Sequence, residues 1–125
     1  MKNKRAEIGV FGEEFTVKYL RKHGYKILKR NFHSRFGEID IIAAKKGIVA
    51  FVEVKTRSED AIFSPREAVD YYKQQKCVKT AQYFLMQQSF ECQPRFDVSE
   101  ILVEKREDGK LSVKQHTYIE NAFSE

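Results

Sequence analysis

The sequence is poor in the residues that mark several special classes of protein. Its 125 residues include only two cysteines, two prolines and six glycines, and no tryptophan. Cys77 and Cys92 stand far apart, so they indicate neither a disulfide framework nor a zinc site. So little proline and glycine excludes collagen-like and low-complexity chains. No window approaches the roughly 20 consecutive apolar residues of a membrane span, so we expect no membrane partner.

Apolar content and charge favour one folded domain with an anionic partner. Hydrophobic residues make up 42% of the chain, which is enough for a core, and residues 1–125 have the size of one ordinary domain. Lys and Arg (23) exceed Asp and Glu (18), which gives a net charge of +5. This excess favours a polyanion such as nucleic acid, although an ordinary basic protein carries a similar charge.

The first residues are basic, as in an export signal. The chain then continues with Glu7, Glu13 and Glu14 where a signal would have an apolar run. We therefore expect no export signal and a cytoplasmic location.

Helix and strand patterns alternate along the chain. Apolar residues at steps of three and four, followed by Gly24, predict an opening helix. The segment Ser64-Pro65-Arg66-Glu67 resembles a capping box at the start of a second helix, and Asp108-Gly109 is typical of a turn between strands. The expected elements are a helix (4–23), three strands (25–32, 36–44 and 48–56), a helix (64–88) and two strands (95–104 and 111–116). This order, α-β-β-β-α-β-β, predicts an α/β fold.

Acidic and basic residues share one face of the third strand. The two-residue period of a strand puts Glu53, Lys55 and Arg57 on the same side. By itself this pattern favours a solvent-facing strand, on which an acid and a base two residues apart form a weak surface pair.

The preceding strand favours a binding site instead. Asp40 lies within an apolar run, where a carboxylate is costly. If Lys46-Gly47 forms a two-residue turn, Asp40 lies opposite Glu53, whereas a three-residue turn would weaken this argument. Facing carboxylates repel each other unless a cation lies between them, and a hard divalent cation prefers oxygen ligands. Lys55 is then placed to hold the water that attacks a phosphate bound to that cation.

The first helix contributes a further acid. Helical spacing puts Glu14 on the charged side and turns Glu13 toward the side of Val10. A carboxylate on that side needs a partner, and Gly9 and Gly12 leave room for another backbone to approach. A structural salt bridge with a lysine and a role in the acidic site explain Glu13 about equally well.

The motifs together resemble a known family. They are Gly12-Glu13, Arg30-Asn31, Gly37-Glu38-Ile39-Asp40, Phe51-Val52-Glu53-Val54-Lys55-Thr56-Arg57 and Arg95-Phe96-Asp97-Val98. Over nearly its whole length the chain resembles the bacterial UPF0102 family, endonuclease-like proteins similar to Holliday junction resolvases of the PD-(D/E)XK nuclease superfamily. The resemblance implies a restriction-endonuclease-like fold, with helices flanking a central mixed sheet. Thr16 departs from the alanine that the family often has in the first helix, outside the presumed site.

The resemblance also implies roles for individual residues. Asp40 and Glu53 would be ligands of Mg²⁺ or Mn²⁺, together with the Val54 carbonyl. Lys55 would orient the attacking water, and Glu13 would be an additional acid that reaches the metal directly or through water. The implied reaction is hydrolysis of a DNA phosphodiester, with branched DNA in repair or recombination as one candidate substrate. A related resolvase is often a homodimer, because two strands must be cut.

Basic residues supply a candidate nucleic-acid surface. Lys73, Lys76 and Lys79 recur at three-residue steps in the second helix, a pattern that can follow a phosphate backbone but more often marks a solvated helix face. Other basic residues flank the acidic motifs in sequence, namely Arg30, Arg35, Lys45, Lys46 and Arg57. The leading hypothesis is a metal-dependent endonuclease, and the alternative is a non-catalytic nucleic-acid-binding module. The facing acids favour the nuclease, because in a module that only binds they would repel phosphate.

Overall fold

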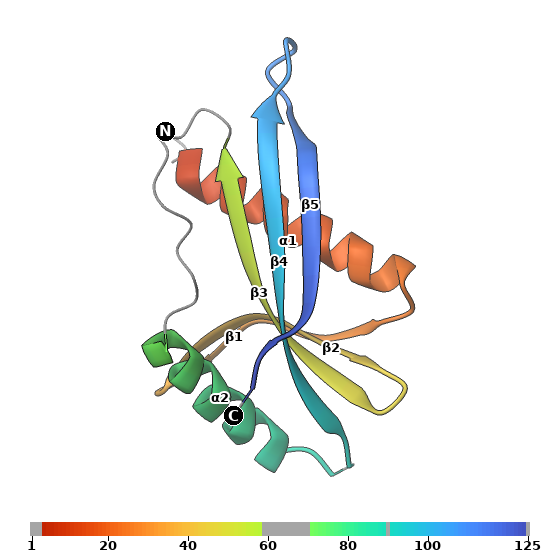
Figure 1. Cartoon of the computed structure of the whole chain (residues 1–125), viewed down its shortest axis with the longest axis vertical. Coiled ribbons are helices and arrows are strands. Elements are labelled where there is room, and N and C mark those ends of the chain that lie inside the picture. The colour runs from red at the N-terminus through yellow and green to blue at the C-terminus, as the bar shows by residue number, and fades with distance from the viewer. Residues whose placement is uncertain (1–3, 59–70, 90, 125) are drawn as a thin grey trace.

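A five-stranded mixed sheet carries one helix on each side in the computed structural model, which describes residues 4–58, 71–89 and 91–124 (Figure 1). The elements are α1 (Lys4–Lys22), β1 (Lys26–Ser34), β2 (Gly37–Lys45), β3 (Ile48–Ser58), α2 (Tyr71–Met86), β4 (Gln93–Lys105) and β5 (Leu111–Phe123). This order confirms the predicted α/β fold and is compatible with a nuclease-like one. The predicted capping box at 64–67 lies outside the described residues.

The strands follow one another across the sheet in chain order, β1-β2-β3-β4-β5. β3 and β4 pair in parallel, and the other neighbouring pairs are antiparallel. A parallel pair needs a crossover, and the connection that contains α2 provides it. The mixed sheet therefore agrees with the fold that the motifs implied.

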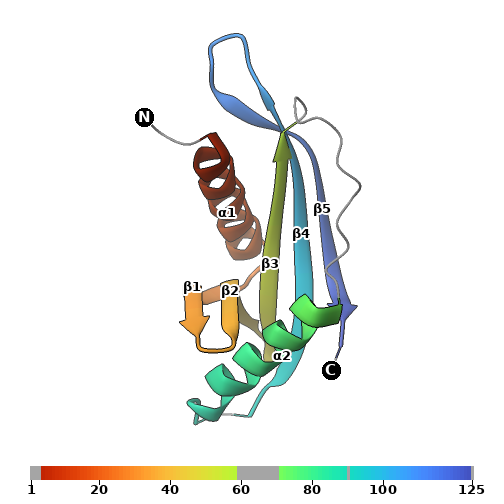
Figure 2. The same ribbon diagram turned by 90° about the vertical axis from the view of Figure 1, so that its left-hand side faces the viewer.

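Each helix covers its own part of the sheet, and Figure 2 shows α1 beside the upper part of β3 and α2 crossing the lower ends of β3 and β4. Val17 and Leu20 of α1 belong to a buried cluster with Ile41, Ala43, Ala50 and Val52. Val78, Ala81 and Phe84 of α2 belong to a second cluster with Ile39, Ile42, Val49, Phe51 and Phe96. Neighbouring residues of β3 thus alternate between the two clusters, as the two-residue period of a strand requires. No helix in the described ranges is both long and apolar enough to cross a membrane.

Local turn residues fix the end of α1 and the connection between β2 and β3. Gly24 adopts a φ of 88°, and its amide donates to the Arg21 carbonyl while the Tyr25 amide donates to the Leu20 carbonyl. These two bonds are those of a Schellman cap, which ends α1 at the expected place. Between β2 and β3, Lys46-Gly47 has positive φ at both residues, 47° and 79°, as in a type I′ turn. The predicted two-residue turn is therefore confirmed.

The last strand is longer than the pattern indicated. β5 extends to Phe123, whereas the alternating pattern predicted an end near residue 116. The extra length is paired with β4, with Val98 opposite Ile119 and Phe96 opposite Phe123. An irregularity lies between these pairs, where Asn121 has a φ of 53°. This bulge breaks the two-residue period, which explains why the sequence pattern ended early.

Gly12 marks the closest approach of α1 to the sheet. A Cβ atom at Gly12 would lie 1.8 Å from Thr56 Oγ1, whereas one at Gly9 would meet nothing within 4 Å. Gly12→Ala should therefore lower the free energy of unfolding by about 1 to 3 kcal/mol through overpacking. Gly9→Ala, the matched control on the same helix, should raise it by about 0.5 to 1 kcal/mol through helix propensity. Urea unfolding of both variants measures this, and an equal effect of the two substitutions would contradict it.

Candidate functional site

The candidate site lies where β2 separates from β3. In Figure 1, β1 and β2 curve across the lower part of the molecule, whereas β3, β4 and β5 run nearly upright. The β2–β3 ladder runs from Lys45 paired with Ile48 to Ile41 paired with Val52 and ends there. The predicted register is therefore confirmed up to Ile41, but Asp40 does not form a ladder pair with Glu53. The two strands form a fork with Asp40 at its base.

Asp40 replaces the missing ladder bond at the fork. Its Oδ2 accepts a hydrogen bond of 2.8 Å from the Val54 amide, which the parting of the strands would otherwise leave without a β2 carbonyl. A buried amide without an acceptor is costly, so the carboxylate helps to end the ladder. The site thus begins with a carboxylate held in place by the backbone of β3.

The backbone of β2 is irregular at the same residue. Ile39 packs in the cluster under α2 and Ile41 in the cluster under α1, although residues two apart in a regular strand share a face. On the other side, Arg30 pairs with Ile41 and Phe32 with Ile39, but no pair joins Asn31 to Asp40 between them. Asn31 has a φ of 51°. These departures turn the Asp40 side chain into the fork.

Burial and the neighbouring acids raise the pKa of Asp40. Burial has the largest effect, and together with Glu13, Glu53 and Glu38 it raises the pKa to about 6, while the bond from the Val54 amide acts in the opposite direction. The carboxylate is ionised at neutral pH but lies among like charges in a half-buried place. A cation at this position would relieve that repulsion.

Glu13 lies on α1 close enough to the fork for its charge to act on Asp40. It is half-buried, and burial raises its pKa, while Arg30 and a side-chain hydrogen bond with Asn31 act in the opposite direction. The expectation for Val10 was wrong, since 59% of it is exposed. Of the two explanations for Glu13, the described part of the chain supplies Asn31 and Arg30 as its neighbours and no lysine, and it also brings Glu13 close enough to act on Asp40.

Glu53 lies on the α2 side of the fork. Its Oε1 is 3.6 Å from Nζ of Lys73, and the two side chains are 24% and 60% exposed. Cys77 is close enough that Glu53 and Asp40, after burial, help to raise the pKa of its thiol to about 12. Cys77 is therefore an unreactive thiol beside the acids. No sequence motif indicated this neighbour.

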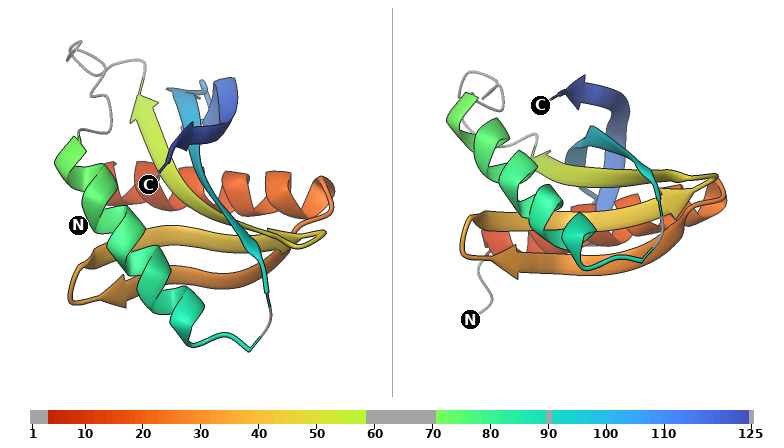
Figure 3. Two further views of the ribbon diagram at one scale, coloured as in Figure 1. Left: turned by 60° about the horizontal axis from the view of Figure 1, so that its bottom comes forward. Right: turned by 90° about the horizontal axis from the view of Figure 1, so that it is seen from below.

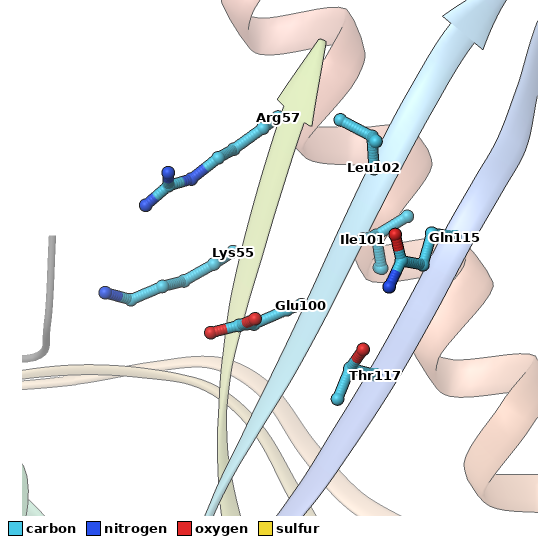
Figure 4. Close-up of a pocket in the computed structure, with 7 residues that line it drawn as sticks. All are labelled: Lys55, Arg57, Glu100, Ile101, Leu102, Gln115 and Thr117. Atoms are coloured by element: carbon cyan, nitrogen blue, oxygen red, sulfur yellow. The ribbon is translucent and has the colours of Figure 1, made fainter. Parts of the chain in front are cut away.

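Lys55 and Arg57 extend the site beyond the fork. Both line a cavity of about 140 Å³ on the open face of the sheet. Figure 4 shows their side chains projecting from β3 on the side that Glu100 of β4 also faces. The other residues that line the cavity are Ile101, Leu102, Gln115 and Thr117. The predicted common face of Glu53, Lys55 and Arg57 thus leads from the acids into a depression over β4 and β5.

The remaining basic residues of the predicted nucleic-acid surface lie on β1, on α2 and in the β1–β2 turn. Arg30 donates a 2.8 Å hydrogen bond to Glu14, next to Glu13. Lys76 is exposed, with its Nζ 5.3 Å from the centre of the Tyr72 ring, and Figure 3 shows α2 passing across β1 and β2. Arg35 lies in the β1–β2 turn, 4.9 Å from the Phe36 ring centre.

The grouping of Lys45 and Lys46 with the acids was wrong. These residues form the turn end of the β2–β3 hairpin. Asp40 lies at the other end, about 17 Å away along a strand that rises about 3.3 Å per residue. Proximity in the sequence misled because a hairpin carries its turn away from its open end.

The oxygen ligands at the fork suit a hard metal ion. Across residues 4–58, 71–89 and 91–124, the structure brings together no group of three or more His, Cys, Asp or Glu side chains able to hold a metal. Two carboxylates and a main-chain carbonyl, from Asp40, Glu53 and Val54, remain the candidate donors. Their chemistry fits Mg²⁺, which usually takes one or two carboxylates and keeps several waters. The raised pKa of Asp40 agrees with this fit, since a cation would stabilise the ionised form.

A buried polar chain, which the motifs did not indicate, holds α1 above the sheet. Thr16 Oγ1 donates to the Gly12 carbonyl and contacts Ser99 Oγ, both at 2.9 Å, and Ser99 Oγ lies 2.9 Å from Nε2 of His116. Thr16 is the position that departs from the resembling family. Its hydroxyl links α1 to β4, and through Ser99 to β5. The only sign of this link in the sequence was a threonine at a helix position where the family often has alanine.

The fold and the acids define the class of protein: an α/β protein with a mixed sheet compatible with a nuclease-like fold. Residues 12–101 match the family described as "Uncharacterised protein family UPF0102". A UPF0102 protein of Caldanaerobacter subterraneus subsp. tengcongensis is 45% identical over 117 residues, 93% of each chain. Another, of Syntrophomonas wolfei subsp. wolfei, is 46% identical over 118 residues, 94% of this chain and 97% of the relative. The chain belongs to the UPF0102 family.

Proposed function

We propose that the protein is a metal-dependent endonuclease that hydrolyses DNA phosphodiester bonds at the fork between β2 and β3. The observation that carries the proposal is the position of Asp40. This half-buried carboxylate lies at the fork, and burial, together with the charges of Glu13 and Glu53 on its two sides, raises its pKa. Acids gathered in this way are unfavourable for a protein that only binds phosphate, and they are useful to one that holds a metal ion.

Each residue of the site has a distinct task in the proposed reaction. Asp40, Glu53 and the Val54 carbonyl would hold Mg²⁺ or Mn²⁺, with Glu13 behind them. The bound ion would supply Lewis acidity and lower the pKa of water. Lys55 orients the attacking water through a hydrogen bond, and Arg57, further along the same face, binds a neighbouring phosphate. The half-buried setting strengthens these electrostatic interactions.

One observation favours a second candidate, a nucleic-acid-binding module without catalysis. The ion pair between Lys73 and Glu53 provides a cation for one of the acids without any metal. Such a module would keep the basic surface and would gain nothing from added Mg²⁺. The two candidates therefore differ in whether DNA is cleaved.

Lys55→Ala should lower the cleavage rate about a hundredfold or more and leave metal binding nearly unchanged. Lys55 positions water, whereas the carboxylates hold the ion, so the two effects should separate. The assay compares single-stranded, duplex and four-way-junction DNA with Mg²⁺, with Mn²⁺ and with EDTA, and calorimetry follows metal binding. Lys110→Ala, in the distant β4–β5 turn, is the control. Full activity of Lys55→Ala would exclude Lys55 from the mechanism, and failure of the wild type on every substrate would favour the binding module.

DNA binding should weaken steeply as salt is added, because phosphate contacts release counterions. Arg57→Gln and Lys76→Gln should each reduce the slope of log K against log salt by about one. Lys46→Gln, at the far end of the β2–β3 hairpin, should leave the slope unchanged. Fluorescence anisotropy in EDTA measures all four proteins. Equal slopes would show that neither Arg57 nor Lys76 contacts the DNA backbone.

A further inference from the structure

The cavity beside the fork is built from two short rows of side chains. In one row Lys55, Glu100 and Thr117 lie opposite one another across β3, β4 and β5, and in the next row Arg57, Leu102 and Gln115 do so. All six line the cavity of about 140 Å³. Opposite side chains in such rows are about 5 Å apart at Cβ, and the rows are about 7 Å apart.

The chemistry of the lining changes across the strands. β3, on the side of the fork, contributes the cations Lys55 and Arg57. β4 contributes a carboxylate, Glu100, beside the apolar side chain of Leu102, and β5 contributes neutral polar groups. Figure 4 shows the two cations and Glu100 extending toward the same side. A matching ligand has its negative charge near the fork, and away from the fork it has a flat apolar face with hydrogen-bond donors on its edge.

This combination excludes two simple ligands. A free phosphate would suit Lys55 and Arg57, but the carboxylate of Glu100 in the middle of the cavity would repel it. A divalent cation would suit Glu100 but would meet the two cations. The volume is below the roughly 300 Å³ of pockets for drug-sized ligands, so the cavity holds one group and not a whole oligonucleotide.

We propose that the cavity binds one unpaired nucleobase of the DNA strand, next to the phosphate held at the fork. This inference rests on the proposed nuclease function, because it places the base's own phosphate on the side of Lys55 and Arg57. The base lies on Leu102, and its hydrogen-bonding edge faces Glu100 and Gln115. That edge is free only in a nucleotide that has left its pairing partner. The preferred substrate is therefore single-stranded DNA or DNA with an unpaired branch.

Glu100 gives the cavity a preference among bases. A carboxylate accepts from an exocyclic amine such as N4 of cytosine, whereas thymine presents the O4 acceptor at the same position. Cytosine and thymine have the same ring size, so they form a matched pair of ligands. Cytosine is bound more tightly.

The test measures binding of deoxycytidine and deoxythymidine oligonucleotides of about 12 nucleotides by fluorescence anisotropy in EDTA, so that neither metal nor cleavage is needed. The wild type should bind the cytidine strand about tenfold more tightly. In Glu100→Gln the difference should fall to about twofold or less, because an amide can accept from cytosine and also donate to thymine. Glu104→Gln, on the same strand but outside the cavity lining, should keep the full preference. The two variants, Glu100→Gln and Glu104→Gln, should bind a fully paired duplex with equal affinity.

Two results would overturn the proposal. One is equal binding of the two strands by the wild type. The other is a uniform gain in affinity in Glu100→Gln, which would show that Glu100 acts only as a charge near phosphate. Cleavage of DNA by the wild type is measured in parallel. Cleavage without base preference would overturn this proposal alone, whereas no binding to any oligonucleotide would overturn the proposed function as well.

Discussion

Asp97→Ala should lower the free energy of unfolding by about 3 to 5 kcal/mol, the usual cost of breaking a buried ion pair by removing one partner. Asp97 has no solvent exposure. Its carboxylate accepts hydrogen bonds from Arg95 Nη2 at 2.8 Å, from the Tyr118 hydroxyl at 2.6 Å and from the Asn121 amide at 3.0 Å. Alanine would leave all three donors without this acceptor, and the Arg95 charge, which is only 15% exposed, would lose its buried partner and keep only the exposed Glu120 nearby.

The control for this prediction uses the second acid beside the same arginine. Glu120 lies 3.8 Å from Arg95 Nη2 and is 63% exposed, so Glu120→Ala should change the free energy of unfolding by no more than about 0.5 kcal/mol. Urea unfolding at neutral pH measures both variants. A similar small loss in both would show that the buried bonds of Asp97 carry no special stability. The bonds to Arg95 show that Asp97, although it belongs to one of the sequence motifs, pairs with a neighbouring basic side chain.

The elements that the sequence predicted well have local signals. The end of α1 depends on Gly24 and on carbonyls a few residues before it, and the β2–β3 turn depends on Lys46-Gly47. In both cases the residues that need a positive φ and those that bond across the turn are neighbours in the chain. All the residues that determine these two features are therefore present in one short segment of the sequence.

The fork could not be predicted because its determinants are distant in sequence. Asp40 was identified from its apolar surroundings, but its bond to the Val54 amide depends on where the β2–β3 ladder ends. The extension of β5 has the same kind of cause. Tyr118 and Asn121 donate hydrogen bonds to the carboxylate of Asp97, which lies more than twenty residues earlier in the chain. Such contacts change the register of a strand, but the local pattern of apolar and polar residues does not indicate them.

The candidate site was predicted only in part for a related reason. Asp40, Glu53 and Lys55 belong to a single hairpin, so the predicted two-residue turn brought Asp40 near Glu53, and the strand period put Glu53 and Lys55 on one face. Glu100 and Gln115 belong to no motif. They reach Lys55 and Arg57 because β4 pairs in parallel with β3 after a long crossover, and sequence alone does not fix that register.

Asp40→Asn should raise the free energy of unfolding by about 1 to 2 kcal/mol in EDTA above pH 7. If the proposed nuclease function holds, the same substitution should abolish cleavage. Asparagine keeps an acceptor for the Val54 amide and removes the charge. The pKa of Asp40 is raised from an ordinary 3.8 to about 6 in the folded protein, which corresponds to at most about 3 kcal/mol. Partial exposure and local relaxation reduce that figure.

The size of this effect depends on pH in a way that identifies its cause. Because the folded-state pKa is the higher one, the protonated form stabilises the wild type fully below about pH 3.8, and this stabilisation is lost as the pH rises through about 6. The advantage of Asp40→Asn should therefore vanish near pH 4 and be complete above pH 7. Thermal melts across this range test it. A constant advantage would point to a cause other than ionisation of Asp40.

Added metal should reverse the order of the two proteins. Mg²⁺ that binds the folded state stabilises it by mass action, and the wild type offers one more charged oxygen ligand than Asp40→Asn does. Melts at neutral pH with millimolar Mg²⁺ should thus place the wild type above the variant, whereas EDTA places it below. Glu38→Gln is a suitable control, because Glu38 also raises the pKa of Asp40 but is exposed at the start of β2. Equal stabilisation of the wild type and Asp40→Asn by Mg²⁺ would contradict a metal at the fork, because the ion would then bind without this carboxylate.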